Sequence, residues 1–483
     1  MWRKLLAGTA MISMKSVKCS DLGSAMNDLP EYTWEEIRTH KTPGQSVWIV
    51  MGNGVYDITR FVEMHPGGDK ILLAAGSSAD PFWNLYRIHK QEKVYDMLES
   101  LRIGNLKAGE KLEAMNDPFS GDPNRSAHLI THTEKAYNGE LPNDLLTEKI
   151  LTPNNEFFVR NHLPVPVVDE NTYELELILE DEKCTSFSLK DLKSKFPIVS
   201  VESSIQCAGN RRFEANQQGV TRGVEWRGGA IGNAIWTGVR LRDILKYLGE
   251  INPEYKHVQI EALDTDPNGP FGTSIPIEKA MDSDTVLAFE MNGETLPRDH
   301  GFPVRLIVPG YVGVRNIKWV KRITLSTSES PLIWHKRDYR LFSPNDSLGN
   351  VNFEERQPVY DMPVQSVICS PLDSTSFNSK NENVNFKGFA YSGGGRGIVR
   401  VELTTDHGES WTEAQLEKRP QRLGRRWSWA FWNANIPASD IEKEVCVRAI
   451  DDAGHGQPES LKSIWNYRGL LTNSWHCIHL TRK

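Results

Sequence analysis

The segment Cys207-Ala208-Gly209-Asn210-Arg211-Arg212 places a thiol a few residues before two adjacent guanidinium groups. A thiolate is the side chain that soft or high-valent metals recruit, and paired arginines bind a small oxyanion through several directed hydrogen bonds. A single cysteine on its own is more often a small buried apolar residue than a ligand. The segment therefore suggests a soft-metal ligand facing an anion site, and this hypothesis needs support from other residues.

Two histidines form a second candidate metal site. His65 precedes Pro66, Gly67 and Gly68, and His89 follows further along the same segment. The proline fixes the backbone beside the first imidazole, and the glycines let the chain pass close to a large flat group. Imidazoles on two separate elements could clamp one planar ligand between them.

Length and composition describe a soluble globular protein without membrane spans. The chain has 483 residues, which suggests about three domains. A hydrophobic content of 39% and a charged content of 25% fit neither a disordered protein nor a membrane protein. The formal net charge of -7 argues against a nucleic-acid partner. The six cysteines are scattered without a CxxC pair, so we expect no disulfide framework and no zinc ribbon.

The elements that must position these residues begin with a compact α+β unit over residues 30–107. Apolar residues 47–51, the turn Gly52-Asn53-Gly54 and residues 55–58 are typical of a β-hairpin. Apolar residues three and four apart predict a helix over 91–101.

Three further segments follow. Residues 108–148 are polar and rich in turn residues, so we expect a linker. Residues 149–344 mix strand and helix patterns and indicate one mixed α+β domain. Residues 345–483 alternate apolar and polar side chains, for example over 399–403 and 426–431, which predicts a β-sandwich. The expected fold class is therefore multidomain α+β with a C-terminal sandwich.

The first 26 residues have the composition of a targeting segment. Four basic residues precede the first acidic residue, Asp21: Arg3, Lys4, Lys15 and Lys18. The apolar stretch of residues 5–14 is too short to span a bilayer. Residues 1–26 are expected to be a mitochondrial targeting segment, with a secretory signal as the alternative.

The segment 30–107 resembles the cytochrome b5 family, whose HPGG signature and distal histidine provide the two axial ligands of a b-type haem. The resemblance implies that His65 and His89 ligate the iron of haem b. Ligation on both faces leaves no open coordination position, which favours electron transfer over oxygen binding.

The rest of the chain resembles the sulfite oxidase family of the animal type, in which a molybdopterin domain follows the haem domain and precedes an immunoglobulin-like dimerisation domain. The resemblance implies that Cys207 is the single protein thiolate on molybdenum. The segments that carry it are 157–162, 207–212, 223–227, 298–305, 314–319, 336–344 and 465–469.

The same resemblance assigns the other site residues. Those implied to hold molybdopterin and its phosphate, together with Cys207, are Phe158, Val159, Arg160, Asn161, His162, Asp264, His300, Arg305, Asn316, Ile317 and Lys318. Those implied to form the substrate pocket, again with Cys207, are Arg160, Arg212, Trp226, Asp338, Tyr339 and Arg468. The individual role of Arg211 stays open.

Taken together, the resemblances imply the two-electron oxidation of sulfite to sulfate at a molybdenum cofactor. Electrons would pass singly through the haem to cytochrome c, or to oxygen, from a homodimer in the mitochondrial intermembrane space. Two alternatives remain. A nitrate-reductase-like molybdoenzyme is disfavoured because in that family the haem module follows the sandwich. A non-catalytic haem electron-transfer adaptor is disfavoured because Cys207, Arg160, Arg212 and Tyr339 are all present.

Overall fold

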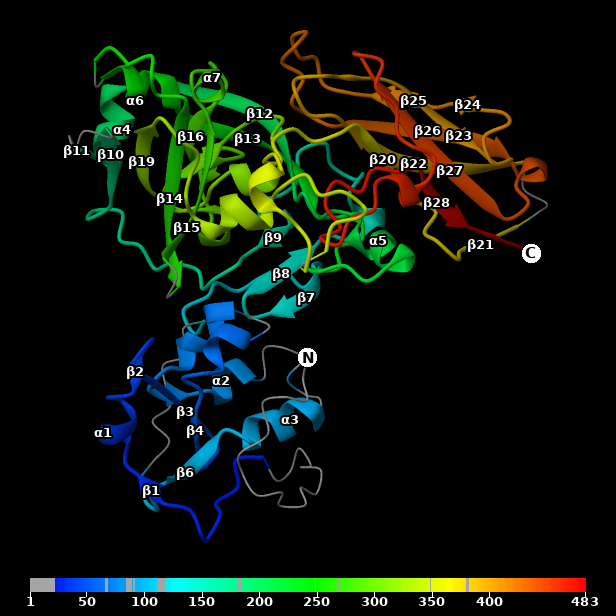
Figure 1. The fold of residues 1–483 in the computed structure, drawn as a ribbon. Coiled ribbons are helices and arrows are strands. Elements are labelled where there is room, and N and C mark those ends of the chain that lie inside the picture. The colour runs from blue at the N-terminus through cyan, green and yellow to red at the C-terminus, as the bar shows by residue number, and fades with distance from the viewer. Residues whose placement is uncertain are drawn as a thin grey trace. The chain divides into compact units, whose positions relative to one another are not determined.

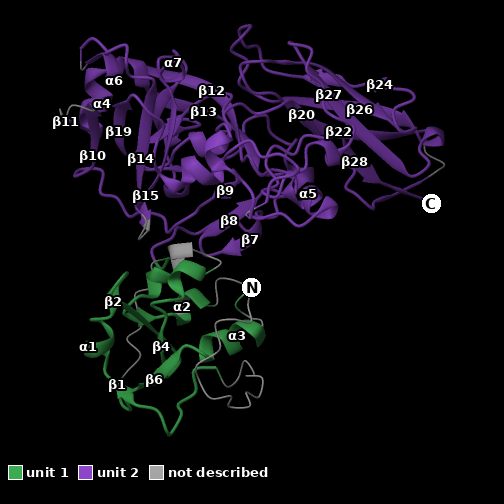
Figure 2. Cartoon of the chain, viewed as in Figure 1, with its two compact units in different colours: residues 1–120, 266–268 green, residues 121–265, 269–483 purple. Residues whose placement is uncertain are grey.

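The computed structural model describes residues 22–65, 68–83, 89, 92–110, 119–179, 184–247, 249–266, 269–347, 349–378 and 382–483. Contacts divide the chain into two compact units, residues 1–120 with 266–268 and residues 121–265 with 269–483 (Figure 2). Most of the expected targeting segment lies outside the described residues, as do Pro66 and Gly67. Within these described ranges, no helix is both long and apolar enough to cross a membrane.

Unit 1 is built on a six-stranded sheet in the order β1-β6-β4-β3-β2, with β5 beside β3 (Figure 1). Its strands are β1 (Glu31–Tyr32), β2 (Lys41–Thr42), β3 (Ser46–Met51), β4 (Gly54–Asp57), β5 (Ser77–Ser78) and β6 (Arg102–Leu106). Its helices are α1 (Trp34–Ile37), η1 (Val62–Met64), η2 (Gly68–Ala74), α2 (Asp80–Trp83) and α3 (Glu92–Glu99).

Local sequence explains the centre of unit 1. The predicted hairpin is confirmed, since β3 and β4 pair antiparallel. Gly52 closes its turn with a φ of 57°, a left-handed conformation that glycine adopts at low cost. The predicted helix is confirmed by α3. In β3, Val47 and Ile49 pack in one apolar cluster and Val50 in another, so both faces of this strand are buried.

The first part of unit 2 holds two five-stranded sheets and one three-stranded sheet. Their orders are β11-β10-β19-β14-β15, β12-β13-β16-β17 with β18 beside β16, and β7-β8-β9. The strands are β7 (Ile130–Glu134), β8 (Tyr137–Glu140), β9 (Val159–Arg160), β10 (Glu174–Leu179), β11 (Cys184–Ser188), β12 (Ile198–Gln206), β13 (Ile231–Arg240), β14 (His257–Asp266), β15 (Gly269–Pro276), β16 (Val286–Met291), β17 (Glu294–Thr295), β18 (Arg305–Ile307) and β19 (Val320–Ser326).

Short helices connect these strands. Helix α4 begins after Ser188, which forms a capping box with Asp191 and so satisfies backbone N–H groups at the helix start. An apolar cluster that includes Leu177, Ile244 and Ile323 joins the strands to α6. The helices are α4 (Leu189–Lys195), α5 (Arg212–Gln218), α6 (Leu241–Tyr247) and α7 (Ile277–Ala280), with the single turns η4 (Asn143–Leu145), η5 (Arg298–His300), η6 (Gly313–Arg315), η7 (Trp334–Asp338) and η8 (Phe353–Glu355).

The predicted linker of residues 108–148 is partly structured. Unit 2 begins at Gly121, and β7, β8 and η4 all fall inside the predicted linker. Strand β8 pairs with β9, so this segment supports Arg160. The prediction differs from the structure because short strands separated by turns have the composition of a linker.

The residues from β20 onward form the predicted β-sandwich. Its two four-stranded sheets have the orders β20-β22-β26-β25 and β24-β23-β27-β28, and β21 pairs with β29. Phe386, Val401, Trp432 and Val447 fill the core. The strands are β20 (Gln365–Ser370), β21 (Ser376–Phe377), β22 (Asn383–Tyr391), β23 (Ile398–Thr404), β24 (Thr412–Glu413), β25 (Gln415–Glu417), β26 (Ala430–Pro437), β27 (Glu444–Asp451), β28 (His476–His479) and β29 (Thr481–Arg482), with the turns η9 (Ala438–Asp440) and η10 (Leu461–Ser463).

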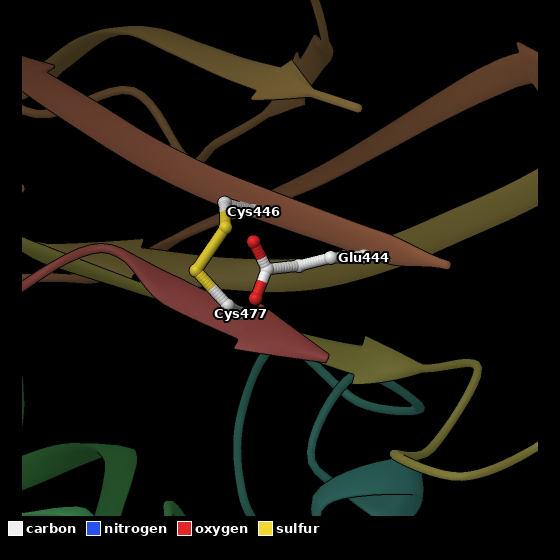
Figure 3. A group of neighbouring side chains, drawn as sticks. All are labelled: Glu444, Cys446 and Cys477. Atoms are coloured by element: carbon white, nitrogen blue, oxygen red, sulfur yellow. A yellow bond between two sulfur atoms is a disulfide. The ribbon is translucent and has the colours of Figure 1, made fainter. Parts of the chain in front are cut away.

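A disulfide joins Cys446 on β27 to Cys477 on β28 (Figure 3). The scattered cysteines predicted no disulfide framework, and for this pair that prediction is wrong. The two cysteines are 31 residues apart, but they are directly opposite each other in the strand ladder. This proximity arises from strand pairing and has no local signature in the sequence.

Candidate functional site

His65 and His89 face each other in unit 1. His65 ends the turn η1, and His89 lies between α2 and α3. Their ring centroids are 6.2 Å apart, and the ring planes are tilted by 37°. A metal ion between two imidazoles forms a bond of about 2 Å to each ring. Adding the distance from each bonded nitrogen to the centroid of its ring accounts for the observed separation of the centroids. The pair therefore fits an iron ion held between two imidazoles.

Trp83 sets the orientation of His89. The carbonyl oxygen of Trp83 lies 3.3 Å from Nδ1 of His89, and the two rings stack with centroids 4.7 Å apart. Because an Nδ1–H that donates to this carbonyl leaves the lone pair on Nε2, Nε2 is the nitrogen available to a metal. Burial lowers the pKa of His89, which favours the neutral ring that ligation requires.

Cys207 is buried in the loop after β12. Its N–H donates to the carbonyl of Ala230 at 2.9 Å. Asn210 ties the same two segments together, because its amide donates to the carbonyl of Gly228 at 3.1 Å and accepts the N–H of Ala230 at 3.0 Å. The thiol is therefore carried by a loop whose backbone is fixed.

Glu140 holds the neighbouring segment from β8. Its carboxylate is fully buried and accepts the N–H groups of Arg227 at 2.8 Å and Gly229 at 2.9 Å. His132 lies 2.7 Å from the same carboxylate, and its ring meets Trp226 edge to face with centroids 5.2 Å apart. Glu140 thus fixes the position of the segment that carries Trp226.

Arg212 lies in a cradle of glycines. A Cβ placed on Gly209, Gly223 or Gly469 would come within 2.7 Å of side-chain atoms of Arg212. Its Nε donates to the carbonyl of Arg468 at 2.8 Å. The close approach of three glycines leaves room for the guanidinium group and restricts its conformation.

The groups around Arg212 interact electrostatically. Burial lowers the pKa of Arg212, while Cys207 and Tyr339 act to raise it and Arg468 and Arg160 act to lower it. Three guanidinium groups, a thiol and a phenol from distant parts of the sequence therefore share one neighbourhood. Converging cations of this kind are suited to a small dianion.

Arg468 reaches this neighbourhood from the sandwich, in the loop between β27 and β28. Its Nη1 lies 3.3 Å from Oδ1 of Asp338. Next to it, the carbonyl of Tyr467 accepts the N–H of Arg222 at 2.9 Å. The sandwich loop is thus part of the wall around the predicted substrate residues.

Arg211 has a different role from Arg212. It precedes α5 with a φ of 63°, and its side chain is fully buried. It donates to the carbonyl of Ser474 at 2.7 Å and pairs with Glu214 at 2.6 Å. The role that the sequence left open is structural, because Arg211 fastens α5 to the sandwich.

A cavity lies beside Cys207, and most of the predicted cofactor residues line it: Phe158, Arg160, His162, Cys207, Asp264, His300, Arg305, Asn316, Ile317 and Lys318. Tyr339 lines it as well. Val159 and Asn161 are buried but do not belong to the lining, and neither do Arg212, Trp226, Asp338 and Arg468.

The lining of the cavity is cationic. Burial lowers the pKa values of Arg305 and Lys318, because moving a positive charge away from water is unfavourable. Among the described residues, Nε of Arg305 has no hydrogen-bond partner. Buried donors of this kind cost free energy, and a bound anionic group relieves that cost. The residues therefore fit an anionic cofactor.

His300 contributes a neutral ring to this cavity. Its Nε2 lies 2.8 Å from the carbonyl of Asn154, and burial lowers its pKa to about 4. Near pH 7 the ring is therefore uncharged, and it can meet a ligand without adding to the positive charge of the lining.

Asp299 partly balances the cations and was missed by the sequence analysis. It accepts two hydrogen bonds from Arg125, at 2.8 and 3.0 Å, and one from Asn161 at 3.0 Å. The backbone carbonyl of Asp299 accepts from Lys318 at 2.9 Å. Arg125 lies in the predicted linker, so no local pattern indicated that it belongs to this site.

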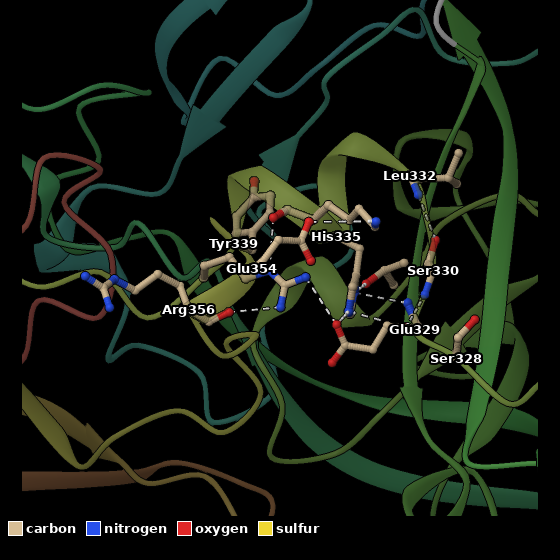
Figure 4. A network of polar contacts seen from close by, with 12 residues as sticks. Ser328, Glu329, Ser330, Leu332, His335, Tyr339, Glu354 and Arg356 are labelled. Carbon is tan, nitrogen blue, oxygen red and sulfur yellow. Dashed lines mark hydrogen bonds and ion pairs between the residues drawn. The ribbon is translucent and has the colours of Figure 1, made fainter. Parts of the chain in front are cut away.

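Tyr339 follows η7 and is held from two sides. Its hydroxyl lies 3.0 Å from Nε2 of His162, and its carbonyl accepts from Arg315 at 3.3 Å. Arg315 in turn lies 2.8 Å from Nδ1 of His335, whose Nε2 lies 3.2 Å from Glu329 (Figure 4). This buried network was also missed, because its members are polar residues without a motif.

Comparison with known families now adds to this geometry. Residues 33–107 match the family described as "Cytochrome b5-like Heme/Steroid binding domain". Residues 162–334 match "Oxidoreductase molybdopterin binding domain", and residues 356–483 match "Mo-co oxidoreductase dimerisation domain". The three matches lie inside the predicted domain ranges, and they support haem b and Mo-molybdopterin as cofactors and a homodimer.

Similar proteins cover most of the chain. The mitochondrial sulfite oxidase of Rattus norvegicus is 43% identical over 93% of this chain and 84% of its own length. That of Drosophila melanogaster is 44% identical over 93% of this chain and 81% of its own length. A solved structure, the sulfane dehydrogenase SoxCD from Paracoccus pantotrophus, is similar with a TM-score of 0.61 and 27% identity over 76% of this chain and 92% of that chain.

The three family matches follow one another along the chain, and the relatives of similar sequence are sulfite oxidases. This chain belongs to the sulfite oxidase family.

Proposed function

We propose that this protein oxidises sulfite to sulfate at a molybdenum cofactor and passes the electrons singly through a b-type haem. The observation that carries the proposal is the shared electrostatic neighbourhood of Cys207, Arg212 and Tyr339 with Arg160 and Arg468. It combines a soft-metal ligand with enough positive charge to hold a small dianion.

The cofactor would be held by the cavity beside Cys207. The thiolate of Cys207 would be the protein ligand of molybdenum, and Lys318 and Arg305 would provide positive charge for the phosphate of the pterin. Phe158, Val159, Asn161, His162, Asp264, His300, Asn316 and Ile317 complete the predicted binding set. When bound, the cofactor supplies the two-electron oxidation and the oxygen transfer, which protein side chains cannot provide.

The protein's own residues select and orient sulfite. Arg160, Arg212 and Arg468 bind the dianion through charge-assisted hydrogen bonds and select it by charge and size. Asp338 holds the Arg468 side chain through their ion pair at 3.3 Å. Trp226, which is fully buried with its ring edge to face with that of Phe158, would stand behind this pocket.

Tyr339 places a hydroxyl beside the thiol and the arginines. Burial raises the pKa of Tyr339, so the phenol keeps its proton near pH 7 and can donate a hydrogen bond. The contact with His162 orients this hydroxyl. Tyr339 thus assists where negative charge develops on the substrate.

Electrons leave through the haem that His65 and His89 would hold, and cytochrome c is the proposed acceptor. Sulfite oxidases of similar sequence are named mitochondrial. On this basis we place the protein in the mitochondrion, in the intermembrane space, where cytochrome c is accessible.

The decisive experiment is an anaerobic titration with sulfite of protein loaded with haem and molybdenum. Sulfite should convert the haem spectrum from oxidised to reduced. Cys207→Ser should abolish this reduction and leave the haem content unchanged, because the thiolate contacts only the molybdenum site. Cys369→Ser, which removes a buried free thiol of the sandwich, is the matched control and should retain reduction. An oxidised haem that stays oxidised in loaded wild-type protein would refute the proposal.

The same preparation separates the alternatives. A nitrate-reductase-like enzyme would reduce nitrate with a reduced viologen as donor. A haem adaptor without catalysis would contain iron and fail to retain molybdenum after reconstitution.

A further inference from the structure

A second cluster of metal-ligating side chains lies outside the molybdenum cavity, on β27 and β28 of the sandwich. Cys446 is directly opposite Cys477 in the ladder, and Glu444 is directly opposite His479. Because positions two apart on a strand point to the same face, all four side chains share one face. Val445, between them, packs into the sandwich core on the other face.

The ligand atoms of this cluster lie close together. Sγ of Cys446, Sγ of Cys477 and a carboxylate oxygen of Glu444 are all within 4.8 Å of one another (Figure 3). Nε2 of His479 lies 3.3 Å from Oε2 of Glu444. Zinc–ligand bonds of about 2.0 to 2.3 Å place neighbouring ligands of a tetrahedral ion roughly 3.3 to 3.8 Å apart. The ligand atoms of Glu444, Cys446 and Cys477 are therefore close to the spacing of a zinc site, and His479 adjoins this group through Glu444.

Among the residues that the structure describes, no other set of three cysteine, histidine or acidic ligands converges to this degree. None of these four residues lines the molybdenum cavity, so the inference does not depend on the proposed function.

The oxidation state of the cysteines controls whether metal can bind. In the structure the two sulfur atoms are bonded to each other, and a disulfide offers no thiolate. Two molecules of a thiol reductant open it, giving two cysteine thiols while the reductant becomes its own disulfide. A divalent ion then displaces both thiol protons as it binds. Two thiolates, an imidazole and a carboxylate form a ligand set that Zn²⁺ accepts.

We propose that Cys446, Cys477, Glu444 and His479 form a redox-gated zinc site, closed by the disulfide under oxidising conditions and binding one Zn²⁺ when reduced. His407 supports the site from the side, because its Nδ1 lies 3.1 Å from Oε1 of Glu444. The carboxylate is thus held in place before any metal arrives.

The test uses the full-length protein with its haem. The protein is reduced with an excess of a thiol reductant, freed of reductant under anaerobic conditions, equilibrated with Zn²⁺ and dialysed, and its zinc and iron contents are measured. Reduced wild-type protein should hold about one more zinc ion per chain than the oxidised protein. Alkylation followed by mass spectrometry should show that zinc slows modification of Cys446 and Cys477 by about tenfold or more.

Variants locate the site. Cys446→Ser should lose the additional zinc, and Glu444→Gln or His479→Gln should raise the zinc Kd by about tenfold or more. Two matched controls should keep the additional zinc: Cys184→Ser, which removes an exposed free thiol, and His455→Gln, which removes an exposed histidine of the same domain.

Two results would overturn the proposal. One is a zinc content of reduced wild-type protein no higher than that of reduced Cys446→Ser. The other is a disulfide that the reductant does not open, as reported by the absence of alkylation at both cysteines.

Discussion

The histidine pair of unit 1 and the cavity of unit 2 are assembled in opposite ways. His65 and His89 lie on one short stretch of chain, and the elements around them belong to unit 1. The cavity region takes Arg160 from β9, Cys207 from the loop after β12 and Arg468 from the sandwich. A site contained in one short segment can be recognised from a motif, whereas a site gathered from distant segments exists only in the complete fold.

The two sites also differ in charge. The histidine pair consists of rings that act as ligands when neutral. The cavity buries Arg305 and Lys318, whose lowered pKa values report the cost of placing cations away from water. The stability of unit 2 should therefore depend strongly on its anionic cofactor, which offsets this cost. Electrostatic interactions should contribute less to the stability of unit 1.

The largest expected effect comes from a variant that should abolish one site and leave the other unchanged. His89→Ala removes one of the paired imidazoles, so the b-type haem spectrum should be lost. Because unit 2 is unchanged, sulfite oxidation with an artificial electron acceptor should stay within about twofold of wild type. Haem spectra and acceptor reduction measure the two outcomes.

His40→Ala is the control within unit 1, since His40 stacks on Trp48 at 3.5 Å and contacts Ser46 away from the histidine pair. It should keep the haem. Inactivation of the molybdenum chemistry by His89→Ala would contradict the independence of the two sites.

The next effect concerns the glycine cradle. Arg212→Lys keeps a positive charge but loses the planar fork that donates to the carbonyls of Arg468 and Val224. We expect kcat/KM for sulfite to fall by about 100-fold, with haem content unchanged. Arg419→Lys is the matched control, because Arg419 is a half-exposed partner of Glu202. Equal kinetics for the two variants would exclude Arg212 from sulfite binding.

A smaller effect is expected from Glu140→Gln. The carboxylate accepts two backbone N–H groups, one on each oxygen, whereas the amide of Gln has a single oxygen and can keep only one of them. The segment that carries Trp226 should therefore shift. We expect kcat/KM for sulfite to fall by about tenfold at unchanged molybdenum content. Steady-state kinetics with metal analysis measure this, and Glu156→Gln, beside the exposed His128, serves as the control. A loss of molybdenum in step with activity would indicate a general folding defect.

The smallest effect concerns pH and stability. Nδ1 of His476 accepts the N–H of Ile368 at 3.2 Å, and burial lowers the pKa of His476 to about 4. The unfolded chain binds this proton near its ordinary pKa of about 6.5, so between these values the unfolded state holds more protons. Stability from this group is complete above about pH 6.5 and falls as the pH drops toward 4, by at most about 3 kcal/mol.

His476→Asn keeps a hydrogen-bond acceptor and removes the titration. Its thermal midpoint should therefore decline less steeply than that of wild type between pH 6.5 and 4, as calorimetry would show. Identical slopes would mean that this histidine does not contribute to acid sensitivity.

The contrast between the two regions also explains how much the sequence could predict. The hairpin of β3 and β4 and the pair His65 and His89 depend on neighbouring residues, so periodicity and motif were sufficient. The alternation over 399–403 predicted the sandwich correctly, but it also implied an inward Val399. The register of β23 shifts between Ile398 and Arg400, and Val399 is 45% exposed.

Other features depend on tertiary pairing and gave no local signal. The disulfide joins cysteines that only the β27–β28 ladder brings together. Glu140 and Asn210 are ordinary polar residues in sequence, and only their backbone partners reveal that they position the segments carrying Trp226 and Cys207. A polar side chain takes such a role when the folded chain places it beside backbone groups that have no other hydrogen-bond partner.

The loop that brings Arg468 to Arg212 limits how these domains can be exchanged. A recombination event at the boundary between the molybdopterin domain and the sandwich would separate one guanidinium group from the others. The hybrid would then lack one part of the proposed anion site even if both halves fold, because the carbonyl and side chain at position 468 would come from a loop shaped for another partner. The two domains are therefore expected to evolve as one inheritable unit, although each has its own hydrophobic core.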